Sequence, residues 1–87
     1  MFKMAYTVKY EISDRSGEKP KFNIAKIVDG FIIEDWKIEE VGNTMLLTVR
    51  HPFDNDNIFE LKRRLCPKRN RMGTIVKILS KERNNDD

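Results

Sequence analysis

The feature that most constrains the fold is the dipeptide Gly42-Asn43, which lies between two segments of alternating side chains. Dipeptides of this kind close two-residue β-hairpin turns. A turn at this point joins a strand at Trp36–Val41 to a strand at Thr44–Arg50. The register that it fixes places mostly apolar pairs on one face: Trp36 opposite Val49, Ile38 opposite Leu47, and Glu40 opposite Met45. The sequence therefore predicts an antiparallel hairpin with one buried face.

An earlier segment, Tyr6–Ser13, has the same period of two and predicts another strand. Its apolar and polar side chains alternate, so one face of this strand is expected to be buried. The expected inward residues are Tyr6, Val8, Tyr10 and Ile12. A polar, turn-rich loop at residues 14–20 ends the strand.

Between this loop and the hairpin, the hydrophobic residues follow the period of a helix. They fall on one helical stripe, made of Ile24, Ile27, Val28, Phe31 and Ile32. Asn23 is the expected N-cap, and Gly30 is expected in the last turn. The alternative takes Asp29-Gly30 as a hairpin turn between two strands. The helix is favoured because Lys26 would occupy the buried face of the strand version.

The last part of the chain predicts a second helix and a final strand. Asp54–Leu65 has the period of an amphipathic helix, and Pro67 ends it. The inward residues of this helix are Ile58, Leu61 and Leu65. Thr74–Ser80 predicts the last strand, and the polar residues 81–87 are expected to fray.

These elements follow the order β-α-β-β-α-β, which is typical of the ferredoxin-like split β-α-β arrangement. The predicted fold class is therefore α+β, with two helices on one face of an antiparallel sheet and the first and third strands in its centre. A chain of 87 residues is long enough for one hydrophobic core. We expect residues 1–87 to form a single domain, with a frayed polar tail at 81–87.

Charge is distributed unevenly along the chain. The net charge is +3, yet every charged residue between Glu60 and Glu82 is positive. A helix dipole and plain solubility explain some of these cations, whereas a phosphate-binding surface explains all of them. The predicted nucleic-acid-binding residues are Lys62, Arg63, Arg64, Lys68, Arg69, Arg71 and Lys77. The expected partner is nucleic acid, RNA in preference to DNA, or else an acidic or RNA-binding host protein.

The sheet face without helices is expected to present no aromatic side chain. This argues against the base stacking by which RNA-recognition motifs bind RNA. Leu46, Ile75 and Leu79 are expected instead to form an apolar streak on that face. Such a streak suits the interface of a homodimer or of another partner.

The sequence predicts no catalytic residue, no metal site and no cofactor. His51 is the one histidine and Cys66 the one cysteine, and neither lies in a catalytic motif. We expect His51 on the surface at a strand end, and Cys66 as a small hydrophobic residue at a helix end. The N-terminal residues do not form a signal peptide, and no apolar run is long enough to span a bilayer. The expected location is the cytoplasm.

Several segments resemble the small ferredoxin-like endoribonuclease family of CRISPR adaptation: Tyr6–Asp14 with Ile24–Val28, Ile58–Leu65 and Thr74–Leu79. The resemblance implies a homodimer that binds nucleic acid and, in some members, a metal-dependent nuclease with an aspartate at the end of the first strand. Glu11 occupies the matching position here, and Asp14 lies nearby. Three hypotheses follow: a non-enzymatic nucleic-acid-binding module, a metal-dependent endoribonuclease, and a phage-encoded inhibitor or antitoxin that blocks a host protein.

Overall fold

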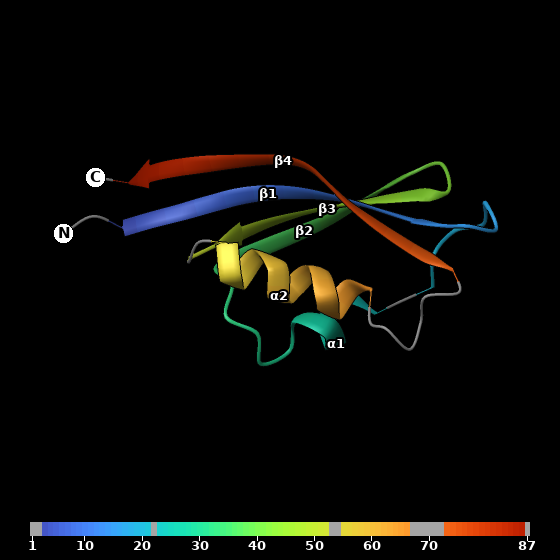
Figure 1. The fold of residues 1–87 in the computed structure, drawn as a ribbon, viewed down its shortest axis with the longest axis horizontal. Helices are drawn as coiled ribbons and strands as arrows, with labels where there is room; N and C mark the ends of the chain where they lie inside the picture. The colour runs from blue at the N-terminus through green and yellow to red at the C-terminus, as the bar shows by residue number, and fades with distance from the viewer. Residues whose placement is uncertain (1–2, 22, 53–54, 67–72, 87) are drawn as a thin grey trace.

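The computed structural model describes residues 3–21, 23–52, 55–66 and 73–86. It shows a small α+β protein with a four-stranded antiparallel sheet and two helices. Along the chain the elements are β1 (Lys3–Asp14), α1 (Ile24–Val28), β2 (Asp35–Val41), β3 (Thr44–His51), α2 (Asn55–Leu65) and β4 (Thr74–Asp86). Both helices lie on the same side of the sheet (Figure 1). The predicted succession of strands and helices is confirmed.

The strands lie in the order β2-β3-β1-β4, so β1 and β3 are central, as expected. The hairpin of β2 and β3 has the predicted register: Trp36 opposite Val49, Ile38 opposite Leu47, and Glu40 opposite Met45. Gly42 has a φ of 63°, which lies in the left-handed region that favours glycine. A glycine with positive φ at the first central position is typical of a type II′ turn. The turn and the strand alternation thus specify the same pairing.

The hydrophobic core lies between the sheet and the helices. Alternate residues of the two central strands are fully buried: Val8, Tyr10 and Ile12 on β1, and Leu47 and Val49 on β3. The helix α2 contributes three buried residues from one face: Ile58, Leu61 and Leu65. The inward faces predicted for the first strand and for the second helix are therefore confirmed.

The helix α1 forms where it was predicted but is shorter than its hydrophobic stripe. The side-chain oxygen of Asn23 accepts a hydrogen bond from the backbone N–H of Lys26, which confirms the N-cap. The helix ends at Val28, and Gly30 follows it with a φ of 72°. The chain leaves the helix at Asp29, which has extended backbone angles, and Gly30 completes a turn in which the N–H of Phe31 donates to the carbonyl of Val28 at 2.9 Å. Ile32 therefore lies in the next segment and is 62% exposed.

The strand β4 is longer than predicted, and the frayed tail at 81–87 is wrong for residues 81–86. These residues pair with the first half of β1, from Lys3 opposite Asp86 to Val8 opposite Lys81. Backbone hydrogen bonds alone extend an edge strand, so the pairing does not require apolar side chains. The ammonium group of Lys81 also lies 4.9 Å from the centre of the Tyr6 ring. The paired strands extend past the helices, and both termini lie at that end (Figure 1).

The predicted apolar streak on the open sheet face does not form. A register shift in β4 pairs Lys9 with Ser80 and Tyr10 with Ile78, so Leu79 has no partner in the ladder. Leu46 lies opposite Glu11, which itself lies opposite Lys77. These charged residues separate Leu46 from Ile75, the partner of Ser13. Ile75 also lines a hollow beside α2. The homodimer that the streak suggested stays a prediction. In the part of the chain that the structure describes, no helix is long and apolar enough to cross a membrane.

Candidate nucleic-acid interface

Two surface hollows of similar size differ in charge. The hollow on the open sheet face, of about 470 Å³, is lined by cations and anions together: Lys9, Lys37, Glu39 and Glu82. The second hollow, of about 440 Å³, lies between α2 and β4. Among the described residues it is lined by three cations and no carboxylate: Arg15, Lys62 and Arg63. We refer to this second hollow as the cationic pocket.

Arg15 reaches the cationic pocket from a tight turn at the end of β1. Its backbone N–H donates a hydrogen bond of 2.7 Å to the carbonyl of Gly73, directly before β4. The carboxylate of Asp14 accepts hydrogen bonds from the backbone N–H and the hydroxyl of Ser16, at 2.9 and 2.8 Å. These two bonds lower the pKa of Asp14. Asp14 is thus engaged with Ser16, and it is not among the residues that line the pocket.

Lys62 and Arg63 come from the last two turns of α2, on the side that faces away from the core. Phe59 precedes them by three and four residues, so the three side chains lie close together on the helix surface. Arg63 lies 3.5 Å from the carboxylate of Glu60, and the two side chains are 79% and 49% exposed. An ion pair this exposed contributes little. It therefore does not prevent Arg63 from binding another anion.

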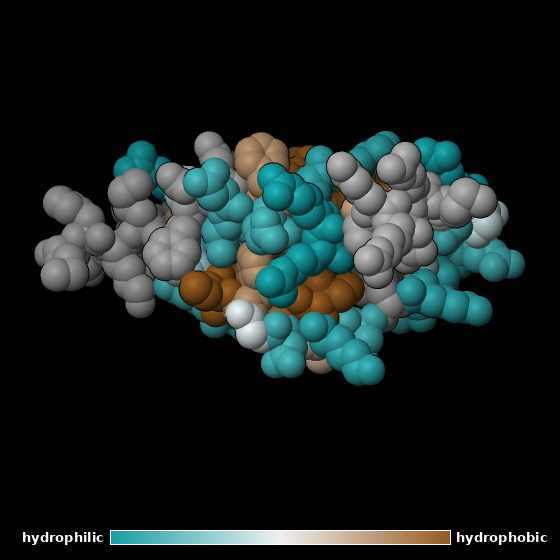
Figure 2. Space-filling model, turned by 60° about the horizontal axis from the view of Figure 1, so that its bottom comes forward, coloured by the Kyte–Doolittle hydropathy of each residue, from teal (hydrophilic) through white to brown (hydrophobic). Residues whose placement is uncertain are grey.

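Apolar atoms form the floor of the pocket. The thiol of Cys66 donates to the carbonyl of Thr74 at 3.2 Å, which ties the end of α2 to the start of β4. Ile75 and Phe59 add further apolar surface, and Phe59 is 52% exposed. Figure 2 shows the helix-bearing face, where apolar surface is exposed between hydrophilic side chains. The pocket thus combines an apolar floor with positive charge.

The other predicted binding residues lie in different places. Lys68, Arg69 and Arg71 fall outside the described residues, in a segment that begins after Cys66 and ends before Gly73. Cys66 lines the pocket, and Gly73 is bonded to Arg15.

The structure does not bring Arg64 and Lys77 to the pocket. The guanidinium group of Arg64 packs 4.7 Å from the centre of the Phe31 ring and donates to the carbonyl of Ile27 at 3.4 Å. Lys77 lies opposite Glu11 in the ladder, on the open face of the sheet. Arg64 thus links α2 to α1, and Lys77 lies on a different surface from Lys62.

Sequence reasoning missed Arg15 and Phe59. The pairing of β1 with β4 brings Arg15 beside Gly73, and no local motif in the sequence predicts that long-range contact. Phe59 had a visible signal, because it is a large aromatic residue on the polar side of α2, one turn before Lys62. An aromatic residue in that position serves the core poorly and is available to a ligand.

The carboxylates proposed for catalysis are not brought together. Glu11 and Asp14 are three residues apart on β1, so their side chains leave opposite faces of the strand. In residues 3–21, 23–52, 55–66 and 73–86, no three histidine, cysteine, aspartate or glutamate side chains are grouped to hold a metal ion. Within one chain, the geometry does not supply the two-carboxylate site of the nuclease hypothesis.

His51 is buried, so its predicted surface position is wrong. It lies on the inward face of β3, and its Nε2 is 2.8 Å from the hydroxyl of Tyr10. Its Nδ1 is 2.6 Å from Oδ1 of Asn57, whose Nδ2 donates to the carbonyl of Ile32 at 3.1 Å. Burial lowers the pKa of His51 and raises the pKa of Tyr10. This histidine links α2 to the sheet through Asn57 and Tyr10.

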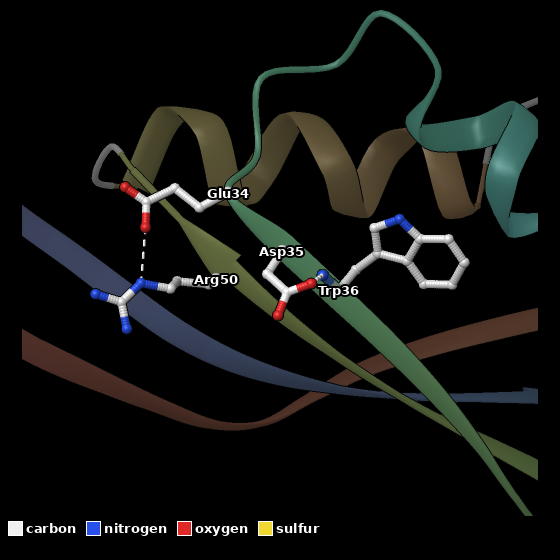
Figure 3. A network of polar contacts seen from close by, with 4 residues as sticks. All are labelled: Glu34, Asp35, Trp36 and Arg50. Carbon is white, nitrogen blue, oxygen red and sulfur yellow. Dashed lines mark hydrogen bonds and ion pairs between the residues drawn. The ribbon is translucent and has the colours of Figure 1, made fainter.

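The open sheet face offers fewer available cations than its sequence implies. Nε of Arg50 is 2.7 Å from a carboxylate oxygen of Glu34 (Figure 3). The carbonyl of Arg50 also accepts the backbone N–H of Glu34. The neighbouring Asp35 accepts the backbone N–H of Trp36 at 2.8 Å (Figure 3). This end of β2 and β3 therefore carries mixed charge, like the hollow beside it.

Comparisons with known proteins find no matching family model, no matching curated protein and no matching solved structure. The function must therefore be inferred from the chemistry of the site.

Proposed function

We propose that this protein is a non-enzymatic nucleic-acid-binding module that contacts the phosphate backbone through the cationic pocket. The observation that carries the proposal is the convergence of Arg15, Lys62 and Arg63, from two distant parts of the chain, on a hollow whose described lining has no carboxylate. Guanidinium groups bind phosphate oxygens in pairs, and ammonium groups act as point charges. Like charges are held together at a cost, and a polyanion offsets that cost when it binds.

Features of the sequence and of the fold support this function. Lys68, Arg69 and Arg71 follow Cys66 and precede Gly73 in the sequence, and in this proposal they add phosphate contacts. The element order and the central position of β1 and β3 support a ferredoxin-like arrangement of the sheet. In this proposal the partner is RNA in preference to DNA. The protein works in the cytoplasm, where a lone cysteine stays reduced.

The test is a salt-dependent binding measurement with a charge-matched control. A variant with Arg15→Ala, Lys62→Ala and Arg63→Ala loses three cations of the pocket. The control carries Lys9→Ala, Lys26→Ala and Lys37→Ala, which are exposed and lie elsewhere. Fluorescence anisotropy with a labelled single-stranded RNA gives the affinity at several salt concentrations. Circular dichroism shows whether each variant is folded.

We expect the pocket variant to bind more weakly and the slope of log K against log salt to become shallower by about 2, because three phosphate contacts are lost. The control should keep most of the affinity and of the slope. Equal losses in the two variants would show that net charge, and not the pocket, governs binding, and would refute the proposal.

The inhibitor or antitoxin hypothesis and the endoribonuclease hypothesis remain predictions. To test the inhibitor hypothesis, the protein is purified without nuclease and the sample is then treated with nuclease. A stoichiometric protein partner that stays bound after this treatment would indicate an inhibitor and not a nucleic-acid-binding module. RNA cleavage that requires a divalent metal and is lost in Glu11→Ala would indicate the nuclease.

A further inference from the structure

The geometry points to an unpaired base as the group that fills the cationic pocket, stacked on the ring of Phe59. The inference rests on the proposed function and narrows it from nucleic acid in general to single strands or unpaired loops. A base in a duplex is stacked on both faces and is hidden from such a pocket. A base in a single strand can leave the stack and contact an aromatic side chain.

Phe59 has the exposure that a stacking platform requires. It is 52% exposed, although the neighbouring residues Ile58 and Leu61 on the same helix are buried in the core. The helix therefore has enough apolar side chains on its inner face without Phe59. A single exposed apolar residue is ordinary, but Phe59 lines a pocket together with three cations and further apolar residues, and this combination makes it a candidate platform.

The surroundings of Phe59 match the two parts of a nucleotide. Ile75 and Cys66 extend the apolar surface on which a base can lie, and Arg15, Lys62 and Arg63 are placed around it to bind the phosphates on either side. The volume of about 440 Å³ is in the range of pockets that hold small organic groups. Charge and apolar surface thus favour a nucleotide over a run of Asp and Glu side chains, which offers no flat aromatic group to the ring.

The open sheet face cannot supply the same contact. Its outward residues on the central strands β1 and β3 are Thr7, Lys9, Glu11, Leu46, Thr48 and Arg50, and none is aromatic. Its hollow also includes Glu39 and Glu82, which repel phosphate. Stacking at this protein is therefore assigned to the helix side of β4, and not to the sheet face.

The experiment compares three RNA probes of one length: a single strand of mixed sequence, the same strand in a duplex, and a strand of abasic sugar-phosphate units. Base–aromatic stacking changes affinity by roughly 5- to 150-fold per base. The wild-type protein should bind the single strand more tightly than the abasic strand by a factor in that range. A duplex carries more phosphate charge per unit length than a single strand, so the two affinities are first corrected for this difference. After that correction, the wild-type protein should bind the duplex no more tightly than the abasic strand.

The variant Phe59→Ala should lower the affinity for the single strand to that for the abasic strand, with the slope of log K against log salt unchanged. Phe59→Trp should restore the preference, because it keeps an aromatic face, and Phe59→Leu should not. The matched control is Ile32→Ala, which removes an exposed apolar side chain elsewhere and should have no effect. Phe59 does not belong to the core, so these variants should fold.

Two results would overturn the inference and are distinguishable. If Phe59→Ala binds every probe as the wild type does, the stacking assignment is wrong while the backbone contact survives. If the wild type binds none of the probes, the proposed function fails as well.

Discussion

The buried contact between His51 and Tyr10 makes the stability of this protein depend on pH in a predictable direction. Asn57 donates through Nδ2 to the carbonyl of Ile32, so its Oδ1 is the acceptor for Nδ1–H of His51. The neutral ring then accepts the hydroxyl proton of Tyr10 at Nε2. A proton added to Nε2 removes this acceptor. The protonated Nε2 then donates to the Tyr10 oxygen, and the Tyr10 hydroxyl has to donate to the carbonyl of Ile58, at the longer distance of 3.4 Å.

The charged form of His51 is therefore disfavoured in the folded state. Burial lowers its pKa below the ordinary value of 6.5, whereas the unfolded chain keeps that value. The unfolded state consequently binds more protons below pH 6.5, and the free energy of unfolding falls as the pH falls. The loss is at most about 1.4 kcal/mol per pH unit, or about 2 kcal/mol by pH 5, and it stops at the folded-state pKa.

Urea denaturation followed by the fluorescence of Trp36 measures this loss at pH values from 8 to 5. We expect the stability of the wild type to be level above pH 7 and to fall below pH 6.5. The variant His51→Leu should be less stable at pH 7 by about 1–3 kcal/mol, because Tyr10 and Asn57 lose their partner, but it should lack this slope. Asp14, whose pKa is lowered, titrates at more acidic pH and does not interfere. Parallel losses in the two proteins between pH 7 and pH 5 would refute the reasoning.

Two further predictions concern Arg64 and the end of β4. Arg64→Ala should lower the free energy of unfolding by about 0.5–1 kcal/mol, because the contact with the Phe31 ring is lost. The affinity of this variant for RNA should stay close to that of the wild type. A loss of RNA affinity as large as that of Arg63→Ala would contradict a purely structural role for Arg64. A chain that ends at Ser80 should lose stability and expose the backbone of residues 3–5 to hydrogen exchange, because among the described residues it is 84–86 that pair with them. An unchanged melting temperature and unchanged exchange would show that the end of β4 contributes nothing.

Local signals explain which parts of the fold were predictable. The hairpin was predicted in full because Gly42 and the strand alternation both act over a few residues. The length of α1 was not predicted, because its hydrophobic stripe continues past the turn at Asp29 and Gly30, where the helix has already ended. The end of β4 was missed because residues 81–83 are polar and exposed, and an edge strand of this kind is held by its partner's backbone.

The candidate site also has a part that the sequence predicts and a part that depends on long-range contacts. The cations of α2 stand out in the sequence, but their meeting with Arg15 depends on the pairing of β1 with β4 across most of the chain. The burial of His51 could have been predicted, since it continues the inward alternation of Leu47 and Val49 on β3. Its place at a strand end and beside Pro52 suggested the surface instead.

The contacts of α2 also explain how a small protein can hold a preformed site. Near the start of the helix, Asn57 is fixed by His51 and by the carbonyl of Ile32. At its end, Arg64 is held by α1 and Cys66 by the carbonyl of Thr74. Hydrogen bonds at both ends of the helix add directional contacts to its close apolar packing. The backbone between these anchors is therefore held in place, so the order gained when a ligand binds is confined mainly to exposed side chains such as Arg63.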